Sequence, residues 1–173
     1  MALVVLLRGI NVGGHRAFRP TALARELRAL DVVNIGAAGT LVVRKPVSRA
    51  HLGAALRARL PSTTRFVVCD GRDLLRLAET VPVDPRPPTA GLIRFVSFLA
   101  RTPREHPPLP LTIPEGPDWY VRLTTLEGRL AVGEHRREMK SIRYLGQLDA
   151  QLGTLVTTRS VNTVSAIVKA LKA

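Results

Sequence analysis

The opening stretch of the chain constrains its fold more than any other feature. Residues 3–7 are five consecutive aliphatic residues, and they lead directly into Arg8, Gly9 and, shortly after, the paired glycines Gly13 and Gly14. Because the aliphatic residues do not alternate with polar ones, they predict a strand that is covered on both faces. Paired glycines permit backbone conformations that a β-carbon would forbid. The sequence therefore predicts a buried strand that leads into a loop suited to binding.

The first part of the chain shows helix and strand patterns in the order β-α-β-β-α-β. Leucines recur every three or four residues over about 20–30 and 48–60, which predicts two helices with one buried stripe each. Short apolar or β-branched runs at 32–35, 40–45 and 65–69 predict strands after the opening one. This order is typical of a ferredoxin-like unit, in which two helices cover one face of an antiparallel sheet.

A proline-rich connection at 81–88 predicts the boundary between two subdomains. Residues 1–80 are expected to form a ferredoxin-like α+β subdomain. Residues 81–173 are expected to form a second α+β subdomain, so that the fold class is α+β with mainly antiparallel sheets. We expect no continuous parallel sheet, because the ferredoxin-like order does not need parallel neighbours.

The second half has fewer clear signals. A strand is predicted at 91–99, a rigid proline-rich surface loop at 102–117 and a hairpin turn at 126–128. The last helix is predicted at 163–171, with Asn162 as its N-terminal cap. The polar segment just before Asn162 is expected to be a loop.

Three segments resemble one known family. Residues 6–14, LLRGINVGG, resemble the signature of the domain of unknown function 1697 family of bacterial proteins. Residues 157–164, TTRSVNTV, resemble that family's TTRNWNTV segment, with Val161 in place of Trp. Residues 39–43, GTLVV, stand where the family has SGNVVF, with Thr40 in place of Asn. The resemblance implies an α+β fold of two subdomains with ferredoxin-like features, and it implies no established activity.

The chain is strongly basic, with a formal net charge of +13 and an isoelectric point near 11.5. Such a balance makes nucleic acid an alternative partner. Most of the basic residues are Arg, they are spread along the chain, and an Arg-, Ala- and Leu-rich composition also results from GC-rich coding. Aromatic residues make up only 4%, which leaves few platforms for stacking bases. We therefore expect nucleic-acid binding to be weak and independent of sequence.

Several kinds of chemistry have no signature in the sequence. Cys69 is the single cysteine, which excludes an internal disulfide and a thiolate metal site, and its apolar neighbours predict a buried core position. The four histidines are scattered without metal-binding spacing. The opening glycines match neither a dinucleotide fingerprint nor a P-loop. We therefore predict no metal and no cofactor, and the sequence leaves open whether the protein is an enzyme.

The targeting signals of secreted and membrane proteins are also missing. The opening apolar run has no basic segment before it and no small-residue cleavage site after it, so it does not resemble a signal peptide. No stretch reaches the roughly 18 apolar residues that span a bilayer. The sequence predicts a cytoplasmic protein without a membrane partner, and it does not predict the oligomeric state.

Two polar segments suggest a site for a small anionic or phosphate-bearing ligand. Each combines a guanidinium with backbone amides that glycines or a helix start make available, and these groups together suit phosphate or carboxylate. We predict that Arg8 and Arg159 face a common cleft, so that the two segments form one site. The alternative is that the glycines serve only a tight turn, Asn162 only caps its helix and Arg159 only pairs with a carboxylate. The candidate ligand-binding residues are Arg8, Asn11, Gly13, Gly14, Thr158, Arg159 and Asn162.

Overall fold

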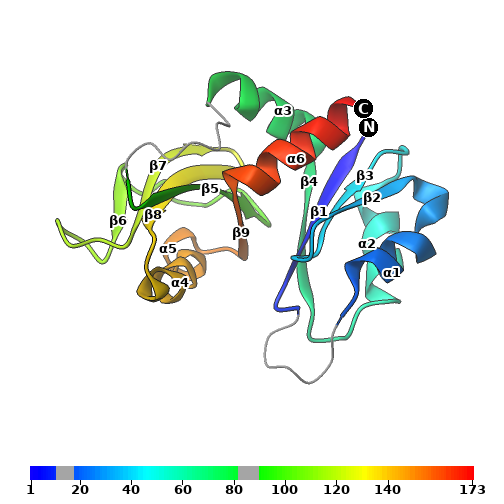
Figure 1. The fold of residues 1–173 in the computed structure, drawn as a ribbon, viewed down its shortest axis with the longest axis horizontal. Helices are drawn as coiled ribbons and strands as arrows, with labels where there is room; N and C mark the ends of the chain where they lie inside the picture. The colour runs from blue at the N-terminus through cyan, green and yellow to red at the C-terminus, as the bar shows by residue number, and fades with distance from the viewer. Residues whose placement is uncertain (11–17, 82–89) are drawn as a thin grey trace. The chain divides into compact units, whose positions relative to one another are not determined.

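The computed structural model describes all 173 residues except 11–17 and 82–89. The chain divides into two compact units, each with its own sheet (Figure 1). The first unit contains residues 1–81 together with 166–173, and the second contains residues 82–165. The expectation that residues 1–80 and 81–173 are separate subdomains stays a prediction.

The first unit has the predicted β-α-β-β-α-β order. Its four strands form one sheet in the order β2-β3-β1-β4, and every neighbouring pair is antiparallel. This is the ferredoxin-like arrangement that the sequence predicts, followed by one further helix. Its elements are β1 (Leu3–Arg8), α1 (Pro20–Glu26), a short 3₁₀ helix (Arg28–Leu30), β2 (Val32–Ile35), β3 (Thr40–Val43), α2 (Arg49–Arg57), β4 (Arg65–Asp70), α3 (Gly71–Thr80) and the end of α6 (Val161–Lys172).

The sheet of the first unit is buried on both faces at β1, as the unbroken apolar run predicts. All five aliphatic residues at 3–7 are at most 3% exposed. One side of β1 packs with α1 and α2, whose buried leucines include Leu23, Leu52 and Leu56. Ser48 caps α2 by accepting a hydrogen bond from the backbone N–H of His51 at 3.1 Å.

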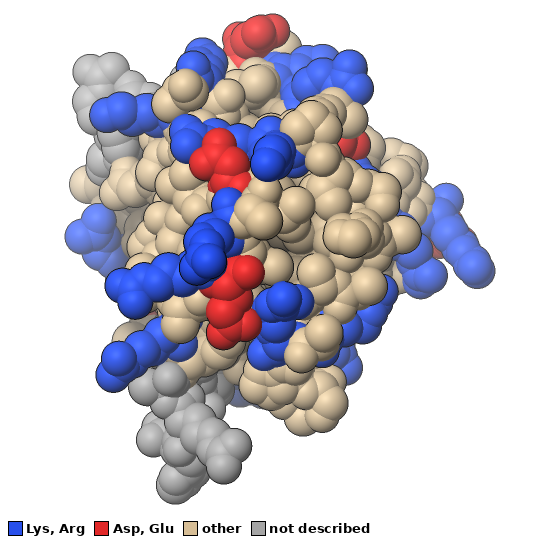
Figure 2. Space-filling view, turned by 90° about the vertical axis from the view of Figure 1, so that its right-hand side faces the viewer, with Lys and Arg blue, Asp and Glu red and all other residues tan. Residues whose placement is uncertain are grey.

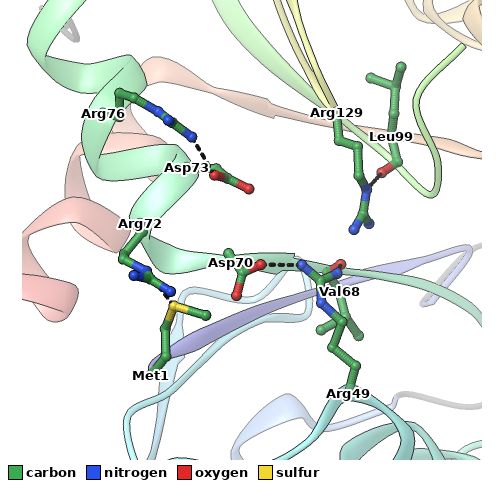
Figure 3. Close-up of polar contacts among 9 residues, drawn as sticks. All are labelled: Met1, Arg49, Val68, Asp70, Arg72, Asp73, Arg76, Leu99 and Arg129. Carbon is green, nitrogen blue, oxygen red and sulfur yellow. Dashed lines mark hydrogen bonds and ion pairs between the residues drawn. The ribbon is translucent and has the colours of Figure 1, made fainter.

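Strand β4 passes directly into α3 without a loop. A β-carbon on Gly71 would lie 2.7 Å from a methyl carbon of Leu171, so a larger residue at this junction would require the Leu171 side chain to shift. The Asp70 carboxylate makes no capping bond to α3 and instead accepts a hydrogen bond from Arg49 at 2.5 Å (Figure 3). Arg49 also donates to the Val68 carbonyl at 2.7 Å, so this one guanidinium ties α2 to the end of β4.

The second unit is a five-stranded antiparallel sheet in the order β6-β7-β8-β5-β9. The helices α4 and α5 contribute to its core, which contains Phe95, Leu123, Leu148 and Leu152. The protein is therefore α+β with two mainly antiparallel sheets. The elements of this unit are β5 (Leu92–Leu99), β6 (Leu111–Ile113), β7 (Val121–Glu127), β8 (Leu130–Arg136), α4 (Met139–Leu145), α5 (Leu148–Leu152), β9 (Val156–Ser160) and the start of α6.

Three sequence-based expectations in this unit are wrong. Residues 111–113 form β6, which pairs with β7, inside the proline-rich stretch 102–117 that is expected to be a loop. Residues 156–160 form β9 rather than a loop, because every one of them pairs with a residue of β5, in the range 95–99. Helix α6 begins at Val161, so Asn162 lies inside its first turn and is not its cap. The hydroxyl of Ser160, which precedes the helix, lies 3.4 Å from the hydroxyl of Thr163. The polar side chains of this segment do not show the pattern typical of a strand, because the strand is stabilised by its pairing with β5.

A glycine in β8 generates a test of this packing. A β-carbon on Gly133 would overlap the Arg122 carbonyl oxygen and lie 2.7 Å from Phe95, inside the core of the second unit. We predict that Gly133→Ala lowers the free energy of unfolding by about 1–3 kcal/mol through overpacking. Gly53→Ala is the control, because a β-carbon there meets only the flexible Arg57 side chain and should stabilise α2 by about 0.5–1 kcal/mol. Urea denaturation of both variants measures the difference, and equal stability of the two would contradict the packing described.

Candidate anion-binding site

The edge strand β9 carries the polar segment that the sequence singles out. In its register with β5, Arg159 lies opposite Val96, Thr158 opposite Ser97 and Thr157 opposite Phe98. Because successive side chains of a strand point to opposite faces, Thr157 and Arg159 share one face of the sheet and Thr158 lies on the other. The structure therefore separates the two predicted site residues Thr158 and Arg159.

The hydroxyl of Thr158 has a structural partner. It lies 2.7 Å from the hydroxyl of Ser97, which is fully buried in the neighbouring strand. This cross-strand hydrogen bond belongs to the kind of pair that stabilises a sheet. Thr158 therefore serves the attachment of β9 to β5.

Thr157 is the residue that sequence reasoning missed. Its side chain is only 3% exposed, and its hydroxyl has no hydrogen-bond partner among the described residues. Burying an unpaired hydroxyl costs roughly 1–3 kcal/mol, and buried polar groups are almost always paired in native proteins. The β-branched run at 156–158 was the signal that could have found it, because such residues favour strands.

Arg159 is half-buried on the same face as Thr157. Its guanidinium donates a hydrogen bond to the neighbouring Thr158 carbonyl at 2.9 Å. Burial disfavours the charged form and lowers the pKa of Arg159 from its ordinary value to about 10. A cation that has lost part of its hydration gains more from an anionic ligand than an exposed one does.

Further arginines occupy this face of the second sheet. Arg94 lies opposite Glu134, and Glu134 lies opposite Arg122, so the three form a row across β5, β8 and β7. Glu134 is 8% exposed and accepts hydrogen bonds from Nε and Nη2 of Arg122, the first at 3.0 Å. Arg94 is two residues from Val96, the partner of Arg159, and is therefore the diagonal neighbour of Arg159 on this face.

Arg136 extends the same face along β8, two residues beyond Glu134. The guanidinium carbons of Arg122 and Arg136 lie 4.5 and 5.3 Å from the centre of the Trp119 ring, and Arg136 also donates to the Trp119 carbonyl at 2.6 Å. We call this surface the arginine face of the second sheet. It carries four guanidinium groups for one carboxylate and consists of Arg94, Arg122, Arg136, Arg159, Glu134 and Thr157.

The other predicted site residues are less well defined. Arg8 ends β1 opposite Arg65 and is half-buried, whereas Asn11, Gly13 and Gly14 lie outside the described residues. Asn162 is exposed in the first turn of α6. Arg8 belongs to the first unit and Arg159 to the second, so their convergence on one cleft stays a prediction.

The first unit has a hollow of about 500 Å³ near the start of β1 and the end of β4. The charged groups that line it, Arg49 and Asp70, already pair with each other at 2.5 Å (Figure 3). In the same view Arg72 bonds the sulfur of Met1 and Arg76 pairs with Asp73. Because these polar groups satisfy one another, the hollow is a weaker candidate site than the arginine face.

Other chemistry finds no support in the described parts of the chain. Outside 11–17 and 82–89, no group of three or more His, Cys, Asp and Glu side chains could hold a metal ion. Cys69 is buried at 3% exposure, as predicted. No helix of the described residues is long and apolar enough to cross a membrane.

The fold and this site define an α+β protein with two antiparallel sheets and an arginine-rich face. The family described as "Protein of unknown function (DUF1697)" matches residues 1–117, and the chain belongs to this family. No curated protein matches the chain. Among solved structures, the chain is similar to the conserved bacterial protein SP0830 from Streptococcus pneumoniae, at 19% identity and a TM-score of 0.62, covering 99% of this chain and 98% of that one.

The comparisons bear on the fold rather than on the site. The matched span includes the opening LLRGINVGG stretch, whereas β9 and the start of α6 lie beyond residue 117. At 19% identity, the likeness to the streptococcal protein shows a shared fold alone. The candidate site therefore rests on the geometry of β9 and its neighbours.

The lowered pKa of Arg159 leads to a prediction on pH and stability. From about pH 10 up to the higher pKa of an arginine in the unfolded chain, the unfolded chain holds this proton more tightly than the folded chain, so the contribution of Arg159 to stability rises with pH in that window. Below this pH window, Arg159 is protonated in both the folded and the unfolded chain, so the free-energy cost of burying its charge does not change with pH. We predict that Arg159→Gln is at least as stable as the unchanged protein near pH 7, and that this advantage shrinks by about pH 11.

The measurement compares urea denaturation of the two proteins at both pH values. Taking the difference cancels the titration of lysines and tyrosines, which the two proteins share. An advantage of Arg159→Gln that stays constant over this range would contradict the pKa shift.

Proposed function

We propose that the protein binds a small phosphate-bearing or other anionic ligand on the arginine face of the second sheet. The observation that carries the proposal lies on one face of β9, where a buried hydroxyl without a partner among the described residues stands beside a partly desolvated guanidinium. A phosphate oxygen accepts hydrogen bonds from both groups. Binding would satisfy the Thr157 hydroxyl and add an anionic partner to the Arg159 guanidinium.

The start of α6 adds to this chemistry. This helix has twelve residues and begins immediately after β9, so its first backbone N–H groups have no partner within the helix. These groups and the helix dipole favour a negative charge near the helix start. The buried hydroxyl of Thr157 is an independent observation on the same strand, four residues before the helix begins.

Arg94 and Glu134 would determine which kind of ligand binds to this face. Arg94 is a diagonal neighbour of Arg159 and brings a second guanidinium to the same region. Glu134, held by Arg122, places one carboxylate beside them. An anion with one phosphate group and a nearby hydroxyl or amine donor therefore fits this face better than a bare chain of phosphates.

The opening loop is the second place where the sequence predicts anion binding. Its candidates are Arg8, Asn11, Gly13 and Gly14, and the support for them is the residue pattern alone. Arg8→Ala tests this part of the proposal by its effect on ligand affinity. The affinity should fall if the opening loop contributes to the same site as Arg159.

Nucleic acid is the alternative partner, and its support is the net charge of +13. On the face that Figure 2 shows, Lys and Arg side chains form several separate groups with Asp and Glu among them. Such a pattern favours weak contacts to phosphates that collapse as salt rises. A titration with DNA and RNA at physiological ionic strength distinguishes the two functions, since nanomolar affinity with sequence preference would favour the alternative.

The threonine pair of β9 provides the sharpest test. Thr157→Val removes an unpaired buried hydroxyl, so we predict stability that is unchanged or higher by about 1 kcal/mol. The same change should weaken binding of inorganic phosphate or a phosphate monoester by about tenfold or more, because a hydrogen bond to a charged group is lost. Calorimetric titration measures the affinity, and urea denaturation measures the stability.

Thr158→Val is the matched control. It removes the hydrogen bond to Ser97 and should lower the free energy of unfolding by about 1 kcal/mol while leaving phosphate affinity unchanged. The proposal predicts opposite signs for the two variants: one gains stability and loses binding, and the other loses stability and keeps binding. Equal phosphate affinity of both variants and the unchanged protein would show that Thr157 does not contact a ligand.

A further inference from the structure

Helix α4 presents two large apolar side chains to solvent. Met139 is 83% exposed and Ile142 is 63% exposed, whereas the other exposed large apolar side chains of the described residues, Met1 and Leu109, are less than half exposed. Residues three positions apart are neighbours on one side of a helix. Met139 and Ile142 therefore form one continuous apolar surface.

The opposite side of α4 is firmly packed. Ser141 is fully buried, and its hydroxyl donates to the Arg136 carbonyl at 2.7 Å. The ring of Tyr144 stacks on the ring of Tyr120 with their centres 4.9 Å apart, and Leu145 packs against the core of the second unit. Because the packing of this side fixes the orientation of α4, Met139 and Ile142 remain exposed on its other side.

Basic side chains surround this apolar pair. Lys140 and Arg143 are exposed on the same short helix, and Arg137 is exposed just before it. Glu138 is the one acidic residue of residues 136–145. We call Met139, Lys140, Ile142 and Arg143 the α4 surface, which joins two apolar side chains to two positive charges.

We propose that the α4 surface docks against an acidic protein segment that presents an apolar stripe or groove. Met139 and Ile142 would insert between apolar side chains of the partner, in the way that a helix face packs into a groove. Lys140 and Arg143 would face carboxylates at the rim of that groove and favour acidic partners over neutral ones. This surface belongs to the second unit and does not depend on the anion site.

Charge argues against the other occupants. A second copy of this chain would bring the same basic residues against one another, and each chain carries a net charge of +13. A lipid surface would meet only two apolar side chains on a helix of seven residues, which is little burial for membrane binding. Because the surface is small, we expect a transient complex.

Methyl NMR provides a direct test, because the chain has only two methionines, Met1 and Met139. The probe is a synthetic amphipathic helix of about three heptads, with leucines on one face and glutamates beside them. The proposal predicts a saturable shift of the Met139 methyl signal at physiological salt, with the Met1 signal unchanged. A peptide of the same composition in scrambled order should produce no such shift.

Two double variants separate the contributions. Peptide affinity is measured by fluorescence from a label on the peptide. The double variant Met139→Ala, Ile142→Ala should lose about tenfold or more in affinity, and the double variant Lys140→Glu, Arg143→Glu should lose at least as much. Arg28→Glu with Arg104→Glu changes the net charge equally at exposed positions elsewhere and should bind within about twofold of the unchanged protein.

The outcomes that overturn the proposal are distinct. Absence of a saturable Met139 shift at millimolar peptide would overturn it, as would equal weakening by the two charge-reversing variants. Sedimentation that shows self-association dependent on Met139 would assign the surface to a second copy. Binding to vesicles of phosphatidylglycerol and phosphatidylcholine, lost in the apolar variant without any peptide binding, would assign it to a lipid surface.

Discussion

The pairing of β9 with β5 is the interaction on which the candidate site depends. The register of this pair fixes which side chains share a face, since Arg159 lies opposite Val96 and Thr158 opposite Ser97. A shift by one residue would move every side chain of β9 to the other face of the sheet. The Ser97–Thr158 hydrogen bond therefore does more than attach an edge strand, because it helps to hold Thr157 and Arg159 in place on the opposite face.

The two groups on that face are unfavourable for folding alone. A buried hydroxyl that has no partner in the described part of the chain, and a guanidinium whose pKa falls to about 10, both reduce stability relative to apolar side chains of similar shape. Well-packed residues support them, including Phe98 and Val96 on the neighbouring strand. Residues that lower stability within a well-packed region are often functional. The side chain that binds a ligand best is often not the one that stabilises the fold best.

Much of the fold could be predicted from the sequence, because long apolar patterns report burial directly. The run at 3–7 indicated a strand buried on both faces, and the leucine stripes gave the element order of the first unit. The second unit was harder to predict. Strand β6 has only three residues and lies within a proline-rich stretch, and β9 is polar at four of its five positions. Both strands owe their backbone bonds to neighbours that are distant in the sequence. The site residues differ in the same way. Arg159 could be predicted from its charge, whereas Thr157 could be recognised only after the strand β9 placed it on the same face as Arg159.

A crystal structure of the protein grown with a phosphate monoester tests the central claim most directly. The account predicts an ordered phosphate within hydrogen-bond distance of the Thr157 hydroxyl and the Arg159 guanidinium, near the start of α6. An ordered phosphate only at exposed arginines away from β9, with the Thr157 hydroxyl bonded to another group of the protein, would contradict it.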